Sequence, residues 1–362
     1  MNESIPLILP RACGGAVGSG TIRTLPEDFQ VTEIPLVTPD GDGEHCWLRI
    51  LKRNTNTAWV AKQLADFAGV SQKNVSYAGM KDRYAVTEQW FSVQLPGRAD
   101  PDWQAIDNED FQVLEARRHS RKLKTGALRG NRFRIRVRDV DADAGAIETR
   151  LAQLRQGIPN SFGAQRFGHE GDNLVQAARL LARPKARVSR NKRSIWLSSV
   201  RSALFNQVLA ARIEAGNWNR PMQGDAFQLE GKSAVFTPDD TDTDIEARCC
   251  AGEIHPTGPL CGSGDVMVSG EAAMLEHKVL SPYRDWIVGL DAFRMKHARR
   301  ALRVMPGELS GVQDAEQQWL LSFSLPAGSY ATSLLYEVFE VKAYNAREGA
   351  VGHEVKTADE SV

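Results

Sequence analysis

Alternating hydrophobic and polar residues predict β-strands in the first 140 residues of the chain. Residues 45–52 (HCWLRILK) and 89–95 alternate with period two, which is the spacing of a half-buried strand. Residues 131–138 (NRFRIRVR) follow this period most closely, with four arginines on one face and the apolar residues on the other. Asn131 shares the face of Phe133, so an amide and an aromatic ring are expected to project together at the start of this strand.

Helical spacing follows the first of these strands. Val60, Leu64 and Phe67 repeat at helical spacing. Asn56 or Thr57 can cap the helix, because a side-chain oxygen can accept from the free amides of the first turn. Gly69 is the expected end of the helix.

The pattern changes near residue 157, after a predicted helix over residues 142–155. A turn-rich segment, GIPNSFGAQRFGHEGDN, follows there, and the next residues read mostly as helices with a strand-like segment. Near residue 304 strands return, with residues 318–325 predicted as a strand and a helix from about residue 332 to 344. The length of 362 residues also suggests two domains.

The simplest fold with this pattern is α+β, with one domain inserted into another. Residues 1–156 and 305–345 are predicted to form a sheet-rich, discontinuous domain, and residues 157–304 the inserted domain. The polar tail, residues 346–362, is predicted to be disordered.

Charge is unevenly distributed, although 45 Lys and Arg balance 45 Asp and Glu. Ten Lys or Arg and no acid lie in residues 117–138, the first basic cluster. The second basic cluster, residues 183–193, has six cations, and the third, residues 294–303, has five. Two interpretations remain open: ordinary solvated faces, or positive surfaces that bind a phosphate backbone.

Several classes of protein are disfavoured. No apolar run approaches the roughly 20 residues that span a bilayer, and the amino terminus lacks the features of a signal peptide, so a cytosolic protein without a membrane partner is expected. The five cysteines are odd in number and scattered, which favours reduced thiols. Cys249, Cys250, His255 and Cys261 have metal-ligand side chains, but no CxxC pair is present, which disfavours a zinc site.

Asp82 is the candidate reactive group. The chain contains no GxGxxG, Walker, GxSxG or HExxH motif. Asp82 lies between Lys81 and Arg83 in a glycine-containing turn, and adjacent cations favour the ionised carboxylate that a nucleophile requires. The alternative is an ordinary turn aspartate that binds nearby amides. The residues alone indicate a nucleic-acid binder with a candidate carboxylate.

Residues 78–90 (AGMKDRYAVTEQW) resemble the signature of the tRNA pseudouridine synthase D (TruD) family, G-x-K-D-K/R-x-A-V-T-x-Q, at every fixed position. Five more segments resemble family blocks in the family's order: PEDFQVTE at 26–33, GNRF at 130–133, PNSFGAQRFG at 159–168, RSALFNQ at 201–207 and LPAGSYATS at 325–333.

The resemblance implies an isomerase that converts uridine to pseudouridine in tRNA, expected at uridine 13, with tRNA as its partner and without any cofactor or metal. It implies a permuted pseudouridine synthase core, a mixed and largely antiparallel sheet with flanking helices, and a TruD-specific inserted α+β domain that forms a cleft with it. A monomer is expected, because the insert completes the cleft. The alternatives are a non-catalytic tRNA-binding or folding protein and an RNA methyltransferase, which would need a cofactor loop.

Site residues are carried over by position from the resemblance. Asp82 corresponds to the essential aspartate, which acts as nucleophile at the ribose C1′ or abstracts a ribose proton. Arg23 stands where the family has a basic partner of that aspartate, with a surface arginine as the alternative. The predicted substrate-binding residues are Phe29, Asn131, Phe133 and Tyr330. Phe133 is expected to stack on the base, unless it is only a core residue, and Tyr330 stands where the family has Phe.

Overall fold

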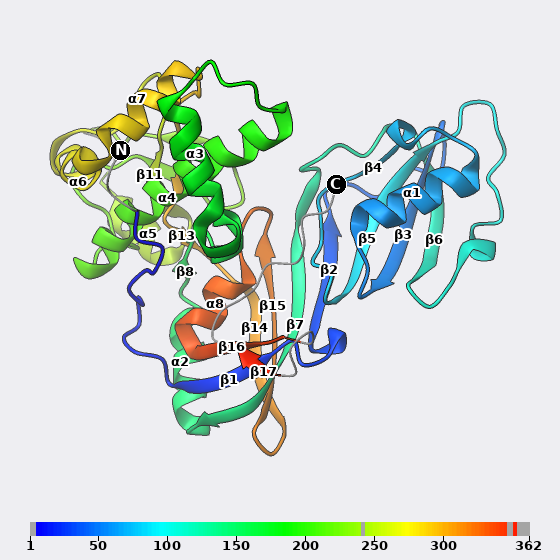
Figure 1. The fold of residues 1–362 in the computed structure, drawn as a ribbon. Helices are drawn as coiled ribbons and strands as arrows, with labels where there is room; N and C mark the ends of the chain where they lie inside the picture. Colours follow the sequence, from blue (N-terminus) through cyan, green and yellow to red (C-terminus); the bar gives the residue numbers. More distant parts are fainter. Residues whose placement is uncertain (1–4, 240–242, 346–349, 353–362) are drawn as a thin grey trace.

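The computed structural model describes residues 5–239, 243–345 and 350–352. An extended sheet with its helices forms one part of the molecule, and α3 to α7 gather in a second part (Figure 1). The α+β prediction is confirmed. No helix among the described residues is long and apolar enough to cross a membrane.

Among the described residues, eleven strands form the large sheet, in the order β17-β16-β1-β7-β2-β5-β3-β6, with the β14–β15 hairpin joined to β7 and with β4 joined to β5. The pairs β1–β16 and β2–β5 are parallel and the others antiparallel, so the sheet is mixed. Its strands are β1 (Gly18–Ile22), β2 (Phe29–Pro35), β3 (His45–Arg53), β4 (Val75–Tyr77), β5 (Val86–Gln94), β6 (Phe111–His119), β7 (Leu128–Ala142), β14 (Gly307–Ala315), β15 (Gln318–Pro326), β16 (Phe339–Asn345) and β17 (Ala350–Gly352).

Strand β7 joins the two halves of this sheet. Its first half lies between β2 and β15, and its last residues pair with β1. The period-two prediction for this strand is confirmed: Phe133, Ile135 and Val137 are buried, whereas Arg132 and Arg134 are exposed. The strand therefore carries core residues and the pocket residues described below on one face.

Helix α1 (Thr57–Ala68) begins and ends where the sequence predicts. Asn56 Oδ1 accepts a hydrogen bond from the Ala58 amide at 2.7 Å. Gly69 ends the helix in the left-handed conformation, with φ of 61°, which glycine adopts without steric cost. Helix α2 (Ala144–Leu154) is also close to its predicted range.

The predicted helix of residues 332–344 is wrong beyond residue 338. Helix α8 (Ala331–Val338) ends there, and Phe339–Asn345 form β16. This segment pairs in parallel with β1, where Phe339 lies opposite Gly18. Because the partner strand lies more than 300 residues earlier, only the folded chain supplies the hydrogen bonds that favour a strand over another turn of helix.

The predicted disordered tail can be compared with the structure in one short segment only. Residues 350–352 form β17, which pairs with β16, and these three residues therefore differ from the prediction. Residues 346–349 and 353–362 of that tail lie outside the described residues.

The second part of the molecule has its own apolar core, which includes Leu180, Phe205, Leu209 and Trp286. It contains a four-stranded sheet in the order β10-β9-β11-β12, and β8 and β13 pair at its junction with the large sheet. Its elements are β8 (Ile158–Pro159), α3 (Asp172–Ala182), α4 (Arg190–Glu214), β9 (Phe227–Leu229), β10 (Val235–Phe236), α5 (Ile245–Ala251), β11 (Ile254–Leu260), α6 (Gly270–Leu280), α7 (Arg284–Ala292), β12 (Ala298–Ala301) and β13 (Arg303–Val304).

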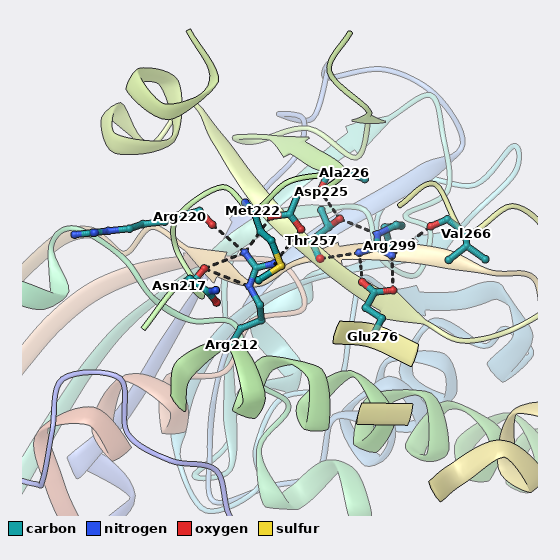
Figure 2. Close-up of polar contacts among 10 residues, drawn as sticks. All are labelled: Arg212, Asn217, Arg220, Met222, Asp225, Ala226, Thr257, Val266, Glu276 and Arg299. Atoms are coloured by element: carbon teal, nitrogen blue, oxygen red, sulfur yellow. Dashed lines mark hydrogen bonds and ion pairs between the residues drawn. The ribbon is translucent and has the colours of Figure 1, made fainter. Parts of the chain in front are cut away.

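A buried polar network joins the elements of this second part (Figure 2). Arg212 of α4 forms an ion pair with Asp225 at 2.9 Å, and Arg299 of β12 forms one with Glu276 of α6 at 2.6 Å. Arg299 also donates to the backbone and hydroxyl oxygens of Thr257 in β11. These contacts tie helices to strands inside the core.

Candidate active site

A pocket of about 220 Å³ opens where the large sheet meets the second part of the molecule. Side chains from β2, β7, the turn before β5 and the start of α8 line it, together with Gln165 from the second part. All six site residues carried over from the family lie around this pocket, namely Arg23, Phe29, Asp82, Asn131, Phe133 and Tyr330.

Asp82 presents a partly exposed carboxylate to the pocket. Its Oδ2 lies 2.8 Å from Nη2 of Arg23, and the Asp82 and Arg23 side chains are 40% and 14% exposed. This geometry gives a charge-assisted hydrogen bond and leaves the rest of the carboxylate open to a substrate. The adjacent cations do not supply this pairing: Lys81 turns to Glu33, and Arg83 is exposed.

Arg23 is held by its backbone and by an aromatic ring. Its φ is 60°, a left-handed conformation that is uncommon for a residue with a β-carbon. Its guanidinium carbon lies 4.3 Å from the centre of the Phe29 ring, within the range of a cation–π contact. The Nε of Arg23 is buried without a hydrogen-bond partner among the described residues.

Lys52 supports the Asp82 turn from behind. Its side chain is fully buried at the end of β3, and Nζ donates to the backbone oxygens of Thr55 at 2.8 Å and of Asp82 at 2.9 Å. Burial lowers the pKa of Lys52 to about 8, against an opposing contribution from Asp82. The sequence contained a signal for this residue, since Lys52 continues the buried face of Leu48 and Ile50.

The turn itself is fixed by neutral side chains. The Lys81 amide donates to Thr57 Oγ1 at 3.2 Å, and this hydroxyl donates to Gln89 Oε1 at 3.0 Å. Gln89 Nε2 in turn donates to the Gly79 oxygen at 3.1 Å. Because α1 and β5 hold the turn on both sides, the backbone that carries Asp82 is fixed in position.

Two phenylalanines form the apolar wall of the pocket. Phe29 and Phe133 meet edge to face, with ring centres 6.4 Å apart. Phe133 also stacks on Phe323, with ring centres 5.3 Å apart, so it belongs to the core and lines the pocket at once. The two interpretations of Phe133 from the sequence are therefore compatible.

Tyr330 closes the pocket from the amino end of α8. Its ring packs edge to face on Phe162, with centres 6.0 Å apart. Arg300 holds the preceding segment, since Nη2 donates to the Gly328 oxygen at 2.9 Å and the guanidinium lies over Phe162 at 4.2 Å. Burial lowers the pKa of Arg300 to about 10.

The basic clusters have three different structural outcomes. In the first cluster, Arg136 and Arg138 form ion pairs with Asp314 and Asp28. In the third, the interpretation as a positive surface is wrong for the buried residues Arg299 and Arg303, because their side chains bind groups inside the core.

The second cluster keeps a largely exposed set of cations. Its six cationic side chains are exposed, and no ion pair involves them among the residues that the structure describes. They lie in the segment between α3 and α4 and in the first turn of α4, and are Arg183, Lys185, Arg187, Arg190, Lys192 and Arg193.

Comparison with known proteins assigns the family. The sequence model of "tRNA pseudouridine synthase D (TruD)" matches residues 15–183 and 170–338. The chain belongs to the TruD family. A TruD protein named tRNA pseudouridine synthase D from Methylococcus capsulatus is 50% identical over 335 residues, covering 92% of this chain and 94% of the relative. The protein of the same name from Xanthomonas campestris is 45% identical over 348 residues, covering 92% and 95%.

The TruD fold is also found by structural comparison. A crystal structure from Methanosarcina mazei, of a protein provisionally assigned to TruD, superposes with a TM-score of 0.72 at 24% identity. The match covers 94% of this chain and 99% of the other. This likeness supports the fold alone.

Some residues in and beside the pocket were not predicted from the sequence. Glu33 does not line the pocket but contacts the pocket residue Lys81, and it was assigned no role. Lys81 was expected only to favour the ionised form of Asp82. Thr332 lines the pocket and was assigned no role, and its buried Oγ1 has no hydrogen-bond partner among the described residues. Gln165 reaches the pocket from a distant block. Their placement depends on contacts between segments far apart in the chain.

The His255 side chain, one of the candidate metal ligands, is bound to other residues. His255 lies 2.6 Å from Glu230 and accepts from Arg303 at 2.9 Å. Within the described ranges, no group of three or more Cys, His, Asp or Glu side chains is arranged to hold a metal ion.

Proposed function

We propose that this chain isomerises uridine 13 of tRNA to pseudouridine in the pocket around Asp82. The observation that carries the proposal is a half-exposed carboxylate that faces an aromatic wall and is paired on one side by Arg23. The names of the TruD relatives support the reaction and the tRNA substrate.

The chemistry follows from these groups. The bond from N1 to C1′ breaks, the uracil turns, and C5 joins C1′; C5 loses a proton while N1 gains one, so atoms and electrons balance without a co-reactant. Asp82 serves as nucleophile at C1′ or as base at the ribose. Arg23 orients the carboxylate through a charge-assisted hydrogen bond. Phe133 holds the detached uracil by stacking, which contributes about 1–3 kcal/mol for a base.

The proposed architecture is a permuted pseudouridine synthase core, residues 1–156 and 305–345, with a TruD-specific insert, residues 157–304. Separate apolar cores on the two sides support this division. Gln165, which lines the pocket together with Asp82 and Asn131, supports a cleft between the two domains. We infer a monomer, because one chain supplies both walls of the pocket. We also infer a location in the cytosol, as the sequence predicts.

The exposed second cluster, residues 183–193, is the proposed tRNA contact of the insert. A flipped nucleotide costs a few kcal/mol, which backbone contacts must offset. Reversing Lys185, Arg187, Arg190 and Lys192 to Glu should lower tRNA affinity and flatten its salt dependence. The matched control reverses Lys62, an exposed cation of α1. Unchanged affinity at fixed salt would remove this cluster from the contact surface.

The reaction is tested with unmodified tRNA that carries tritium at C5 of uridine, without any cofactor. Wild type should release tritium, and Asp82→Asn should reduce release at least about 100-fold while tRNA binding and thermal stability remain. Asp66→Asn, an exposed carboxylate on α1, is the matched control and should match wild type.

The same measurement separates the alternative function. A folded wild type that binds tRNA but releases no tritium would support a non-catalytic tRNA-binding protein. Equal release by wild type and Asp82→Asn would overturn the assignment of the carboxylate.

A further inference from the structure

We propose that Glu33 and Lys81 are positioning residues that lock the Asn131 amide as a hydrogen-bond donor to an oxygen of the target uridine. The inference rests on the proposed function and adds a recognition device to its pocket. Asn131 was carried over from the family as a binding residue, but neither the direction of its amide nor the groups that set it follow from that resemblance.

The three side chains form one continuous contact. Lys81 Nζ lies 2.9 Å from Glu33 Oε2 and donates to Asn131 Oδ1 at 2.8 Å. The Lys81 and Glu33 side chains are only 6% and 1% exposed. Asn131 is half-buried and lines the pocket. We call Glu33, Lys81 and Asn131 the relay. It begins in the core and ends at the substrate side of the pocket.

The chemistry of the ammonium group decides the amide orientation. Lysine donates three hydrogen bonds and accepts none. A flipped Asn131 would place its NH₂ group against the ammonium and leave a buried donor unsatisfied, which is costly. Oδ1 must face Lys81, and Nδ2 must face away. Within the described chain, Nδ2 has no protein acceptor and is not among the buried unsatisfied atoms.

Backbone register holds the relay in place. Glu33 on β2 lies opposite Asn131 on β7, and Glu33 Oε1 accepts from the Trp90 amide of β5 at 3.3 Å. Lys81 directly precedes Asp82, so one turn presents the carboxylate and sets the amide. A shift of this turn would disturb both contacts together.

A fixed donor has a consequence for recognition. The exocyclic oxygens of uracil and the ribose hydroxyls can accept from Nδ2, whereas the N4 amino group of cytosine offers only donors. The relay therefore favours uridine over cytidine where Nδ2 meets O4, and favours ribose over deoxyribose where it meets the 2′-hydroxyl.

The test is a mutant cycle on kcat/KM, measured by tritium release. Asn131→Ala should lower kcat/KM at least about tenfold. Glu33→Gln combined with Lys81→Met removes both charges and leaves no unpaired buried ion; it should lower kcat/KM about two- to tenfold. The triple variant should equal Asn131→Ala, because the relay acts only through that amide. Thermal unfolding of each variant checks folding.

A matched variant separates positioning from packing. Asn131→Asp can pair with Lys81 but donates nothing to the substrate, so it should lose as much activity as Asn131→Ala. Activity near wild type for Asn131→Asp would overturn the proposal. Glu33→Gln and Lys81→Met are introduced together into wild type and into Asn131→Ala. If they lower kcat/KM by the same factor in both, the two residues do not act through the amide, and the proposal is overturned as well.

Substrate analogues identify the accepting atom. 4-Thiouridine replaces O4 with sulfur, and 2′-deoxyuridine lacks the 2′-hydroxyl. The analogue that removes the oxygen bound by Nδ2 should slow wild type by a larger factor than it slows Asn131→Ala. Equal slowing of both proteins by each analogue would contradict an accepting oxygen at either position. Release by wild type on ordinary tRNA reports separately on the proposed function.

Discussion

Arg212 in the second part of the molecule and Arg23 at the pocket show two different uses of a guanidinium group. Arg212 is buried, and every nitrogen has a partner: Asp225, the sulfur of Met222, and the backbone oxygens of Asn217 and Arg220 (Figure 2). Arg23 binds one oxygen of a half-exposed carboxylate, and its buried Nε has no protein partner in the described structure.

The difference teaches how to separate a structural network from a functional one. A buried network stabilises a fold only when all its members are satisfied. Around Asp82 this condition is not met, since Arg23 Nε and Thr332 Oγ1 both lack partners among the described residues. Both atoms belong to residues that line the pocket, where a bound substrate can supply the missing partners.

The largest expected effect is a loss of stability when Arg212 is replaced. Arg212→Met leaves Asp225 as an unpaired buried charge and should destabilise the protein by about 3–5 kcal/mol. Denaturant unfolding measures this. Arg23→Met is the matched comparison, and because Asp82 remains partly in water its cost should stay below about 1 kcal/mol. Equal losses for both variants would break the comparison between the two arginines.

Replacing Arg23 should lower the reaction rate much more than it lowers stability. Arg23→Ala removes the charge-assisted bond to Asp82 and should lower the single-turnover rate about 10- to 100-fold, the equivalent of roughly 1–3 kcal/mol. Arg23→Lys keeps the charge and should recover part of the rate. A rate for Arg23→Ala within about twofold of wild type would show that the pairing has no part in the chemistry.

The buried Lys52 beside the Asp82 turn should make the stability of the protein depend on pH. Its pKa is lowered to about 8 in the fold from 10.5, so between these values the unfolded chain binds more protons and stability rises with pH. The stability of wild type relative to Lys52→Met should therefore increase by about 1 kcal/mol from about pH 7 to about pH 9. Urea unfolding at both values measures this, and a pH-independent difference would contradict a depressed pKa.

The smallest effect is expected at Tyr330. Its ring contacts Phe162 and lines the pocket, and phenylalanine preserves that ring. Tyr330→Phe should change kcat/KM by less than about threefold, whereas Tyr330→Ala removes the ring and should cost at least about tenfold. A large loss for Tyr330→Phe would assign a role to the hydroxyl and add it to the polar groups of the site.

Much of the site followed from the sequence because motif residues can be matched position by position. All six predicted residues surround one pocket. The adjacent cations did not indicate which side chain pairs with Asp82, however, because a side chain next to Asp82 in the chain need not face it. Lys81 turns into the core toward Glu33, and α8 ends six residues before its predicted end because β16 finds a strand partner in β1.

By itself, the sequence determined what depends on neighbours within one element. The period of β7, the cap at Asn56 and the stop at Gly69 require no distant contact. Only the tertiary structure decided which charges meet. Arg23 lies 59 residues from Asp82 in the chain, and Glu33 of β2 meets Lys81 of the turn before β5. The reason is physical: an ion pair needs two groups within about 4 Å, and strand pairing, not local order, brings them there.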